Sequence, residues 1–222
     1  MNKFLGSSAV LAIMILAPHT AQAADAALAA APYDWTGFYI GGQLGADFLH
    51  PNPVGGGNPT DRMPDGVGFE AGLNAQALWQ TGSFVLGGII DGNISGFNLS
   101  IDCPNPAFTC KDGSNWNASV RAKAGFAADR FLVYGTGGWG WADYNVSATN
   151  KGSGAFFSTS TTKGGWVVGA GASYAVNDKW SVNAEYLHYD LGSATPTALT
   201  FSGTFFEKPT IDTVVLGVSY KF

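Results

Sequence analysis

The chain has 222 residues, of which only 12% are charged, about half the share usual in soluble globular domains. A net charge of -5 offers no basic surface for nucleic acid, and an aromatic content of 14% excludes a disordered chain. Beyond Pro18 no apolar run approaches the roughly 20 residues that a membrane-spanning helix needs. These exclusions leave a glycine-rich, aromatic and weakly charged chain of β type.

The first 23 residues have the pattern of a secretory signal peptide. Lys3 supplies the positive charge, residues 4–17 form the apolar region, and residues 21–23 (A-Q-A) match the cleavage site. The apolar stretch is too short for a membrane anchor. We therefore expect export and removal of residues 1–23. The alanine-rich residues 24–34 are expected to form an N-terminal tail in the periplasm.

Two cysteines, Cys103 and Cys110, flank a short segment that contains two prolines. In an exported chain, a pair this close predicts a disulfide that closes a loop. A zinc site would need four ligands, and neither His50 nor His188 is near in sequence. The C-x-x-C spacing of redox proteins is also absent. We expect a structural disulfide bond, no metal site and no cofactor.

Eight segments alternate apolar and polar residues, as strands with two different faces do. They cover residues 37–48, 67–79, 84–95, 116–127, 131–145, 164–175, 180–190 and 211–222. Each has about the length of a tilted strand that crosses a membrane. The sequence therefore predicts eight spanning strands.

The joints between these segments alternate in length. The long joints are residues 49–66, 96–115, 146–163 and 191–210, and the short ones are residues 80–83, 128–130 and 176–178. Long loops outside and short turns in the periplasm are typical of outer-membrane barrels. The predicted fold over residues 35–222 is all-β, an eight-stranded antiparallel up-and-down transmembrane β-barrel with both termini in the periplasm.

A soluble barrel would show the same alternation, with its apolar rows facing the lumen. The size of the side chains has to decide whether the apolar rows face the lumen or the outside. Rows of Trp, Phe and Tyr from eight strands would crowd a lumen that has room only for modest side chains. Aromatic residues near the strand ends instead suit the two membrane interfaces. The prediction is lipid on the outside.

The fifth segment does not follow this rule. Leu132 and Tyr134 have one parity, whereas Trp139 and Trp141 have the other. A β-bulge near residues 137–138 would place all four side chains on the same face. We therefore expect a bulge there.

Six charged residues fall on the polar rows and are expected inside the barrel. They are Asp47, Glu70, Asp91, Arg121, Lys123 and Glu185. An unpaired buried ion costs several kcal/mol, so these charges should pair across the lumen. Asp91 and Arg121 lie at similar depth beside residues 96–115 and are the expected partners. The network is either a gate on a narrow path or a structural plug, and the narrow interior favours the plug.

Three stretches carry a resemblance to a known family. WTGFYIGGQLG (35–45), GTGGWGWADY (135–144) and TVVLGVSYKF (213–222) resemble the RopB-type small outer-membrane β-barrel proteins of alphaproteobacteria, also called porin-family or outer-membrane immunogenic proteins. The resemblance extends from about Tyr33 to the C-terminus. It implies an eight-stranded barrel, surface-exposed loops, and a C-terminal aromatic residue, here Phe222, that the barrel-assembly machinery recognises.

Two patterns suggest chemistry but are weak. Residues 135–140 match G-x-G-x-x-G, but a dinucleotide site needs a helix after the glycines, and none follows. His188 and Asp190 share a face and could form a base with its orienting carboxylate. The nearest serine, Ser193, lies in a predicted loop rather than beside them. We expect no catalytic residues and no enzyme.

The expected function is that of an integral protein of the Gram-negative cell outer membrane, with a role in envelope integrity and surface interaction. Its expected partners are outer-membrane lipids, lipopolysaccharide, the barrel-assembly machinery and an external ligand, host or phage that contacts the loops; nucleic acid is not among them. The alternatives are a narrow porin-like channel for small solutes and, third, a lipid-directed enzyme.

Overall fold

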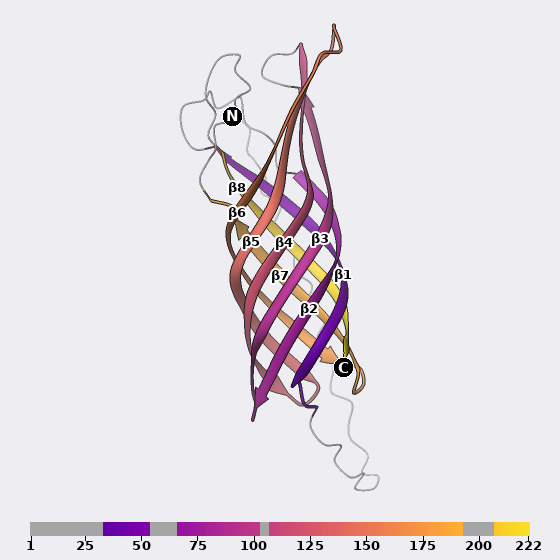
Figure 1. The fold of residues 1–222 in the computed structure, drawn as a ribbon, viewed down its shortest axis with the longest axis vertical. Helices are drawn as coiled ribbons and strands as arrows, with labels where there is room; N and C mark the ends of the chain where they lie inside the picture. Colours follow the sequence, from indigo (N-terminus) through magenta and orange to yellow (C-terminus); the bar gives the residue numbers. More distant parts are fainter. Residues whose placement is uncertain (1–32, 54–65, 103–106, 193–206) are drawn as a thin grey trace, which may run out of the picture. The chain divides into compact units, whose positions relative to one another are not determined.

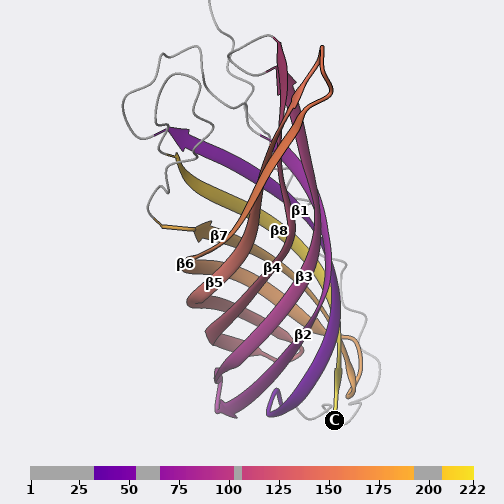
Figure 2. The same cartoon turned by 45° about the horizontal axis from the view of Figure 1, so that its top comes forward.

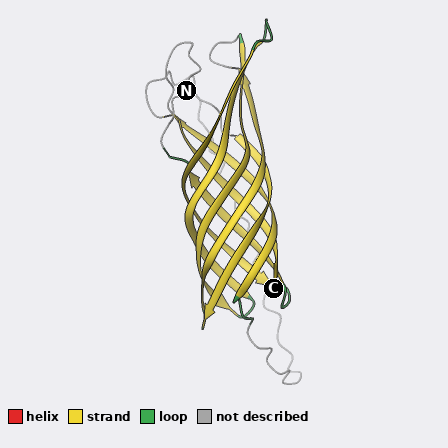
Figure 3. Ribbon diagram, in the orientation of Figure 1, coloured by secondary structure: helices red, strands yellow, loops and turns green. Residues whose placement is uncertain are grey.

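The structure is a computed structural model, and it describes residues 33–53, 66–102, 107–192 and 207–222. Each strand pairs antiparallel with its neighbours in the chain, and β8 pairs with β1 to close the barrel (Figures 1 and 3). The strands are β1 Gly37–Pro53, β2 Gly66–Thr81, β3 Phe84–Asp102, β4 Phe108–Ala128, β5 Phe131–Asn150, β6 Phe156–Ala175, β7 Trp180–Asp190 and β8 Glu207–Lys221. The predicted fold class is confirmed. No helix in these ranges is long and apolar enough to cross a membrane.

The alternation of residues along the strands sets the two faces of the wall. On β7, Trp180, Val182 and Tyr186 are exposed on the outside, whereas Ser181 and Glu185 between them are buried in the lumen. Successive side chains of a strand point to opposite faces, so the polar row fills the narrow interior. The apolar row covers the outside, as the sequence predicts.

Aromatic residues mark two levels on the outer wall. Trp166 and Tyr174 both point outward from β6, eight residues apart. That separation is about 26 Å along a strand and about 20 Å along the membrane normal at the tilt of such barrels. The two levels therefore bracket an apolar band of roughly membrane thickness.

Two of the predicted long loops are mostly strand, which corrects the sequence-based boundaries. β3 continues to Asp102 and β4 begins at Phe108, and β5 and β6 are joined only by residues 151–155. Above the apolar band both faces of a strand can be polar, so the alternation that identifies a spanning strand disappears while the backbone pairing continues. The prediction of loops at 96–115 and 146–163 is wrong for this reason.

The rim of the barrel is uneven as a result. β3, β4, β5 and β6 project beyond the rest of the wall as a four-stranded sheet, which we call the projecting sheet, whereas β7 stops at Asp190 (Figures 1 and 2). Register shifts occur at the base of the projecting sheet, on β3 between Ile94 and Phe97 and on β4 between Gly113 and Asn117. Such bulges bend a strand and increase its twist.

The bulge expected near residues 137–138 is not present. β5 pairs without interruption with both neighbours across these positions. Leu132 and Tyr134 point inward and are buried, whereas Trp139 and Trp141 point outward. The expectation failed because it assumed that every apolar side chain faces lipid, and the interior contains apolar layers of its own.

Candidate functional site

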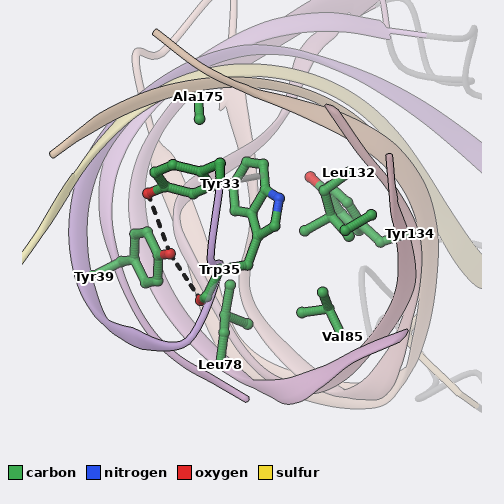
Figure 4. Close-up of a cluster of buried hydrophobic side chains, with 9 residues drawn as sticks. Tyr33, Trp35, Tyr39, Leu78, Val85, Leu132, Tyr134 and Ala175 are labelled. Atoms are coloured by element: carbon green, nitrogen blue, oxygen red, sulfur yellow. Dashed lines mark hydrogen bonds between the residues drawn. The ribbon is translucent and has the colours of Figure 1, made fainter. Parts of the chain in front are cut away.

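The lumen near the short turns is filled by an apolar group, the turn-end cluster, shown in Figure 4. Its members are Tyr33, Trp35, Tyr39, Leu78, Val85, Ala127, Leu132, Tyr134 and Ala175. The ring of Trp35 is 1% exposed and meets Tyr33 edge-on, with 4.9 Å between the ring centroids. The hydroxyl of Tyr39 donates to the carbonyl of Trp35 at 2.8 Å. The segment before β1 therefore turns into the barrel and occupies its end.

Sequence reasoning did not find this cluster. Tyr33 falls within the tail expected over residues 24–34, yet its side chain is buried with the barrel residues. The available signal was the pair of aromatic residues, Tyr33 and Trp35, that interrupts an alanine-rich stretch just before the first strand. Aromatic side chains this close to a barrel mouth can bury a large apolar area.

A charged layer lies above the turn-end cluster and is organised by Arg121. Its Nη2 lies 2.7 Å from Asp91 Oδ1 on the neighbouring strand, and its Nη1 lies 2.5 Å from Glu185 Oε1 on β7. Ser119 and Thr136 accept further hydrogen bonds from the guanidinium at 2.9 and 3.1 Å. The side chains of all three charged residues are at most 5% exposed. The structure thus brings Asp91 and Arg121 together and adds Glu185 from across the lumen.

Lys123 contacts different groups. Its Nζ donates to Gln76 Oε1 at 2.9 Å and lies 3.6 Å from the centroid of the Tyr134 ring. An amide oxygen and an aromatic face stabilise a buried ammonium without a carboxylate. Lys123 therefore connects the charged layer to the turn-end cluster.

Asp47 and Glu70 are held by neutral donors. Thr213 and Ser95 donate to Asp47 at 2.8 and 3.0 Å, and Asn117 donates to Glu70 Oε2 at 2.7 Å. The six charges that the sequence places inside are all buried, but they do not form a single ion-pair network. Buried polar groups need hydrogen-bond partners, and hydroxyls and amides supply them here, except at Glu70 Oε1, which has no hydrogen-bond partner among the described residues.

Five amide side chains form a hydrogen-bonded part of this interior that the sequence analysis did not single out as a group. They are Gln43, Asn74, Gln76, Asn93 and Asn117, each buried and hydrogen bonded to another polar side chain. All five occupy the polar rows of their strands, and that parity was the available signal. Together with the ions they seal the middle of the lumen.

A second apolar group, the loop-end cluster, closes the interior above the charged layer. It consists of Leu49, Ala142, Val167, Leu187, Tyr189, Leu191, Ile211 and Val215. A cavity of about 20 Å³ lies beside it, lined in part by Asp47, Ser95 and Asn117. That is room for about one water molecule. The interior is thus packed at three successive levels.

Two of the four glycines in residues 135–140 lie where the interior is closely packed. A β-carbon at Gly138 would collide with the carbonyl of Val120, and one at Gly140 would lie 2.7 Å from the ring of Tyr189. Both positions lie where a neighbouring group approaches the strand closely. Of the three glycines in the G-x-G-x-x-G pattern, only Gly140 is therefore required by close packing, because a β-carbon at Gly137 would meet nothing within 4 Å and one at Gly135 would make only ordinary contacts.

His188 does not pair with Asp190. Its Nδ1 lies 2.6 Å from Asp212 Oδ1 on β8, an oxygen that also accepts from the Tyr186 hydroxyl at 2.6 Å. His50 Nε2 lies 3.3 Å from the other oxygen of Asp212. Asp190 instead accepts from the backbone of Gly192 at 3.1 Å. His188 and Asp190, the expected base and carboxylate, therefore contact different groups.

The remaining predicted residues are the two cysteines and the C-terminal Phe222. Cys103 lies outside the described residues, so the expected disulfide with Cys110 is not described either. Phe222 is exposed, its ring lies 5.2 Å from that of Tyr220, and its N–H donates to the carbonyl of Phe38 at 3.0 Å. Within the described ranges no group of three or more potential ligand side chains is arranged to hold a metal ion.

Comparison with known proteins agrees with this architecture. The family model described as outer membrane protein beta-barrel domain matches residues 9–222. The 31 kDa outer-membrane immunogenic protein of Brucella melitensis is 33% identical over 97% of this chain and 96% of its own. The 22 kDa outer membrane protein of Rhizobium leguminosarum is 30% identical over 85% of this chain and 78% of its own.

Solved structures add the fold. The attachment invasion locus protein Ail of Yersinia pestis superposes with a TM-score of 0.51 at 16% identity, over 84% of this chain and 99% of its own. Neisserial surface protein A gives 0.50 at 16% identity, over 84% and 98%. The RopB-type resemblance seen in the sequence is confirmed, and so is the location in the outer membrane. The chain belongs to the outer membrane protein β-barrel family.

Proposed function

We propose that this integral outer-membrane protein is a closed scaffold that holds a surface structure in place and does not conduct solutes. The observation that carries the proposal is the Arg121 bridge, which joins β4 to β3 and β7 through buried ion pairs. The turn-end cluster lies below the bridge and the loop-end cluster above it. Three packed layers leave little room for a hydrated ion in a barrel of eight strands.

The test is single-channel recording on the purified, refolded protein in planar bilayers. The proposal expects the current to stay at the background of protein-free bilayers. Steady, reproducible conductance steps from the wild-type protein would contradict it and would favour the alternative, a narrow channel for small solutes.

We also propose that the protein is not an enzyme. His188 Nδ1 contacts the carboxylate of Asp212, and Tyr186 and His50 contact the same carboxylate. These four side chains therefore form a compact hydrogen-bonded unit on the outer wall. A general base needs an adjacent nucleophile or an activated water. Hydrolysis of phospholipid or lipid A that disappears in His188→Ala would overturn this proposal.

Several features near the chain ends and loops belong to the same proposal. Residues 1–23 would be removed on export and residues 24–32, which precede the buried Tyr33, would lie in the periplasm. Cys103 and Cys110 would form a disulfide, and Phe222 would be read by the barrel-assembly machinery. Lipids contact the apolar wall of the barrel. We propose that lipopolysaccharide and an external ligand, host or phage contact the part of the protein that faces the outside of the cell. Mass spectrometry of the mature, unreduced protein tests both the cleavage site and the disulfide.

A further inference from the structure

Among the described residues, the β6 edge of the projecting sheet has no paired strand over part of its length. β6 pairs with β5 from Phe156 onward, but its pairing with β7 starts only at Trp166, opposite Asp190. Among the described residues, no strand pairs with positions 156–162 on the side away from β5. This stretch reads FFSTSTT.

The direction of each amide on this stretch follows from the two ends of β6. The N–H of Ala175 donates to Arg130 before β5, whereas the N–H of Val176 donates to Trp180 at the start of β7. In an antiparallel ladder the direction alternates from residue to residue, and the register of β5 and β6 is unbroken. The N–H groups of Phe156, Ser158, Ser160 and Thr162 therefore point to the exposed edge.

Several other strand ends at the rim have features that protect an edge, and positions 156–162 lack them. Natural sheets block exposed edges with proline, charge or a bulge. The end of β1 contains Pro51 and Pro53, the start of β8 contains Pro209, and β3 has a register shift just below its projecting part. Positions 156–162 have no proline, no charged residue and no register shift.

The edge is also held rigid, which lowers the entropy cost of binding. Asp143 on β5 accepts hydrogen bonds from Asn115 at 3.0 Å, Asn145 at 2.7 Å and Ser160 at 2.7 Å. These bonds join β4, β5 and β6 in the projecting sheet. A preorganised edge can bind a strand without first being ordered itself.

We propose that the exposed edge of β6 at residues 156–162 binds an extended polypeptide segment of an external protein by β-strand addition. Outward N–H groups along a strand match the backbone of another chain, and this main-chain pairing supplies the affinity. The uncharged serines and threonines admit a weakly polar partner strand, and the exposed ring of Phe156 adds an apolar contact at one end. This inference rests on the proposed surface role and names its site.

A second copy of the chain fits this edge poorly. Two copies in one membrane are related by a rotation about the membrane normal. With strands tilted by about 35–45°, the two β6 edges would then cross at roughly 70–90° and could not form a ladder. The partner that suits this edge is therefore a strand from outside the membrane.

Proline and valine at position 158 give a matched pair of variants. Ser158→Pro removes an N–H that points to the edge and leaves the ladder with β5 intact, because that ladder uses odd-numbered amides of β6. Ser158→Val keeps the N–H and favours strand. Phe156→Pro, with Phe156→Val as its control, repeats the test at the first residue of β6, where proline is tolerated best.

The probe is a display library of random ten-residue peptides, selected on the wild-type protein in lipid nanodiscs. We expect the selected peptides to bind Ser158→Val within about twofold of the wild type and Ser158→Pro at least tenfold more weakly. Hydrogen exchange should slow at the amides of Ser158 and Ser160 in the bound state and stay unchanged at Thr159 and Thr161. Heat-dependent mobility on gels checks that each variant is folded.

Three results would overturn the site. The first is a selection that enriches no peptide, and the second is binding that both proline variants retain. The third is slow exchange of the even-numbered amides in the free protein, which would show that another part of the chain covers the edge. None of these three results concerns the conductance of the barrel. The closed-scaffold proposal is tested by conductance, so it would remain valid if the binding site were disproved.

Discussion

The guanidinium of Arg121 on β4 and the carboxylate of Glu185 on β7 meet across the lumen at 2.5 Å. β4 and β7 are not neighbours in the barrel, so this contact ties together parts of the wall that share no backbone hydrogen bonds. The two side chains are 1% and 5% exposed, and neither charge can be solvated if the other is removed. The pair therefore braces the barrel as well as filling it.

Loss of Arg121 should destabilise the folded barrel strongly. Arg121→Met leaves Asp91 and Glu185 buried without their cation, and breaking a buried ion pair costs about 3–5 kcal/mol. Urea unfolding in lipid vesicles, followed by the mobility of unheated samples on gels, measures the loss. Thr161→Ala, at an exposed position of β6, should change the free energy of unfolding by less than about 0.5 kcal/mol.

Neutralising the partners should rescue that variant in part. The triple change Arg121→Met, Asp91→Asn and Glu185→Gln removes the uncompensated charges, so it should be more stable than Arg121→Met alone. If Arg121→Met unfolds at the same urea concentration as the wild type, the brace is not an energetic feature and the plug interpretation fails.

Removing one seal should not open the barrel. Trp35→Ala empties part of the turn-end cluster, but the Arg121 layer and the loop-end cluster remain. We expect bilayer currents at background for Trp35→Ala, together with a loss of stability of about 3–5 kcal/mol from the deleted buried ring. Steady current from this single variant would show instead that the segment before β1 acts alone as a gate.

The orientation of the barrel can be checked by labelling in intact cells. In a background of Cys103→Ser and Cys110→Ser, Gly152→Cys should react with a membrane-impermeant maleimide because it lies in the turn at the tip of the β5–β6 hairpin. Asn177→Cys, in the short turn between β6 and β7, should react only after the outer membrane is permeabilised. The reverse pattern would invert the topology.

Deletion of Phe222 separates assembly from stability. The residue contributes one ring contact to Tyr220 and one hydrogen bond to Phe38 at the end of the seam, so its loss should cost the finished barrel only about 1–2 kcal/mol. A recognition signal would affect the insertion step instead. We expect a clear fall in the amount of protein in the outer membrane, with near-normal unfolding of the molecules that insert. Normal membrane levels would rule out the signal role.

Much of this architecture could be predicted because lipid imposes a strict alternation on spanning strands. The eight strands and their outward apolar rows follow from residue parity, and the similar depth of Asp91 and Arg121 follows from their positions on either side of residues 96–115. The alternation carries no information where that constraint ends. Above the membrane, residues such as Ser158 and Ser160 sit in strands with two polar faces, and the sequence alone makes them look like loop.

The interior was harder to predict for a different reason. Parity identifies which side chains point inward, but it does not say which of them meet across the lumen. Glu185 pairs with Arg121, whereas Lys123 contacts the neutral side chain of Gln76. Which of these contacts forms depends on the stagger of the strands around the barrel. The burial of Trp35 depends on a reversal of the chain before β1, for which no periodic pattern exists.

The hydrogen bond between Thr213 and Asp47, 2.8 Å long, joins residues that are 166 positions apart in the chain. All other strand pairs are hairpins between successive segments, and such local pairings form fast, whereas closure between distant segments is slow. The last contact to form during folding should therefore be the one between β1 and β8. A fluorophore pair placed on the outward faces of these two strands would report the closing time of the ring directly, while a pair on any hairpin would report only its early, local steps.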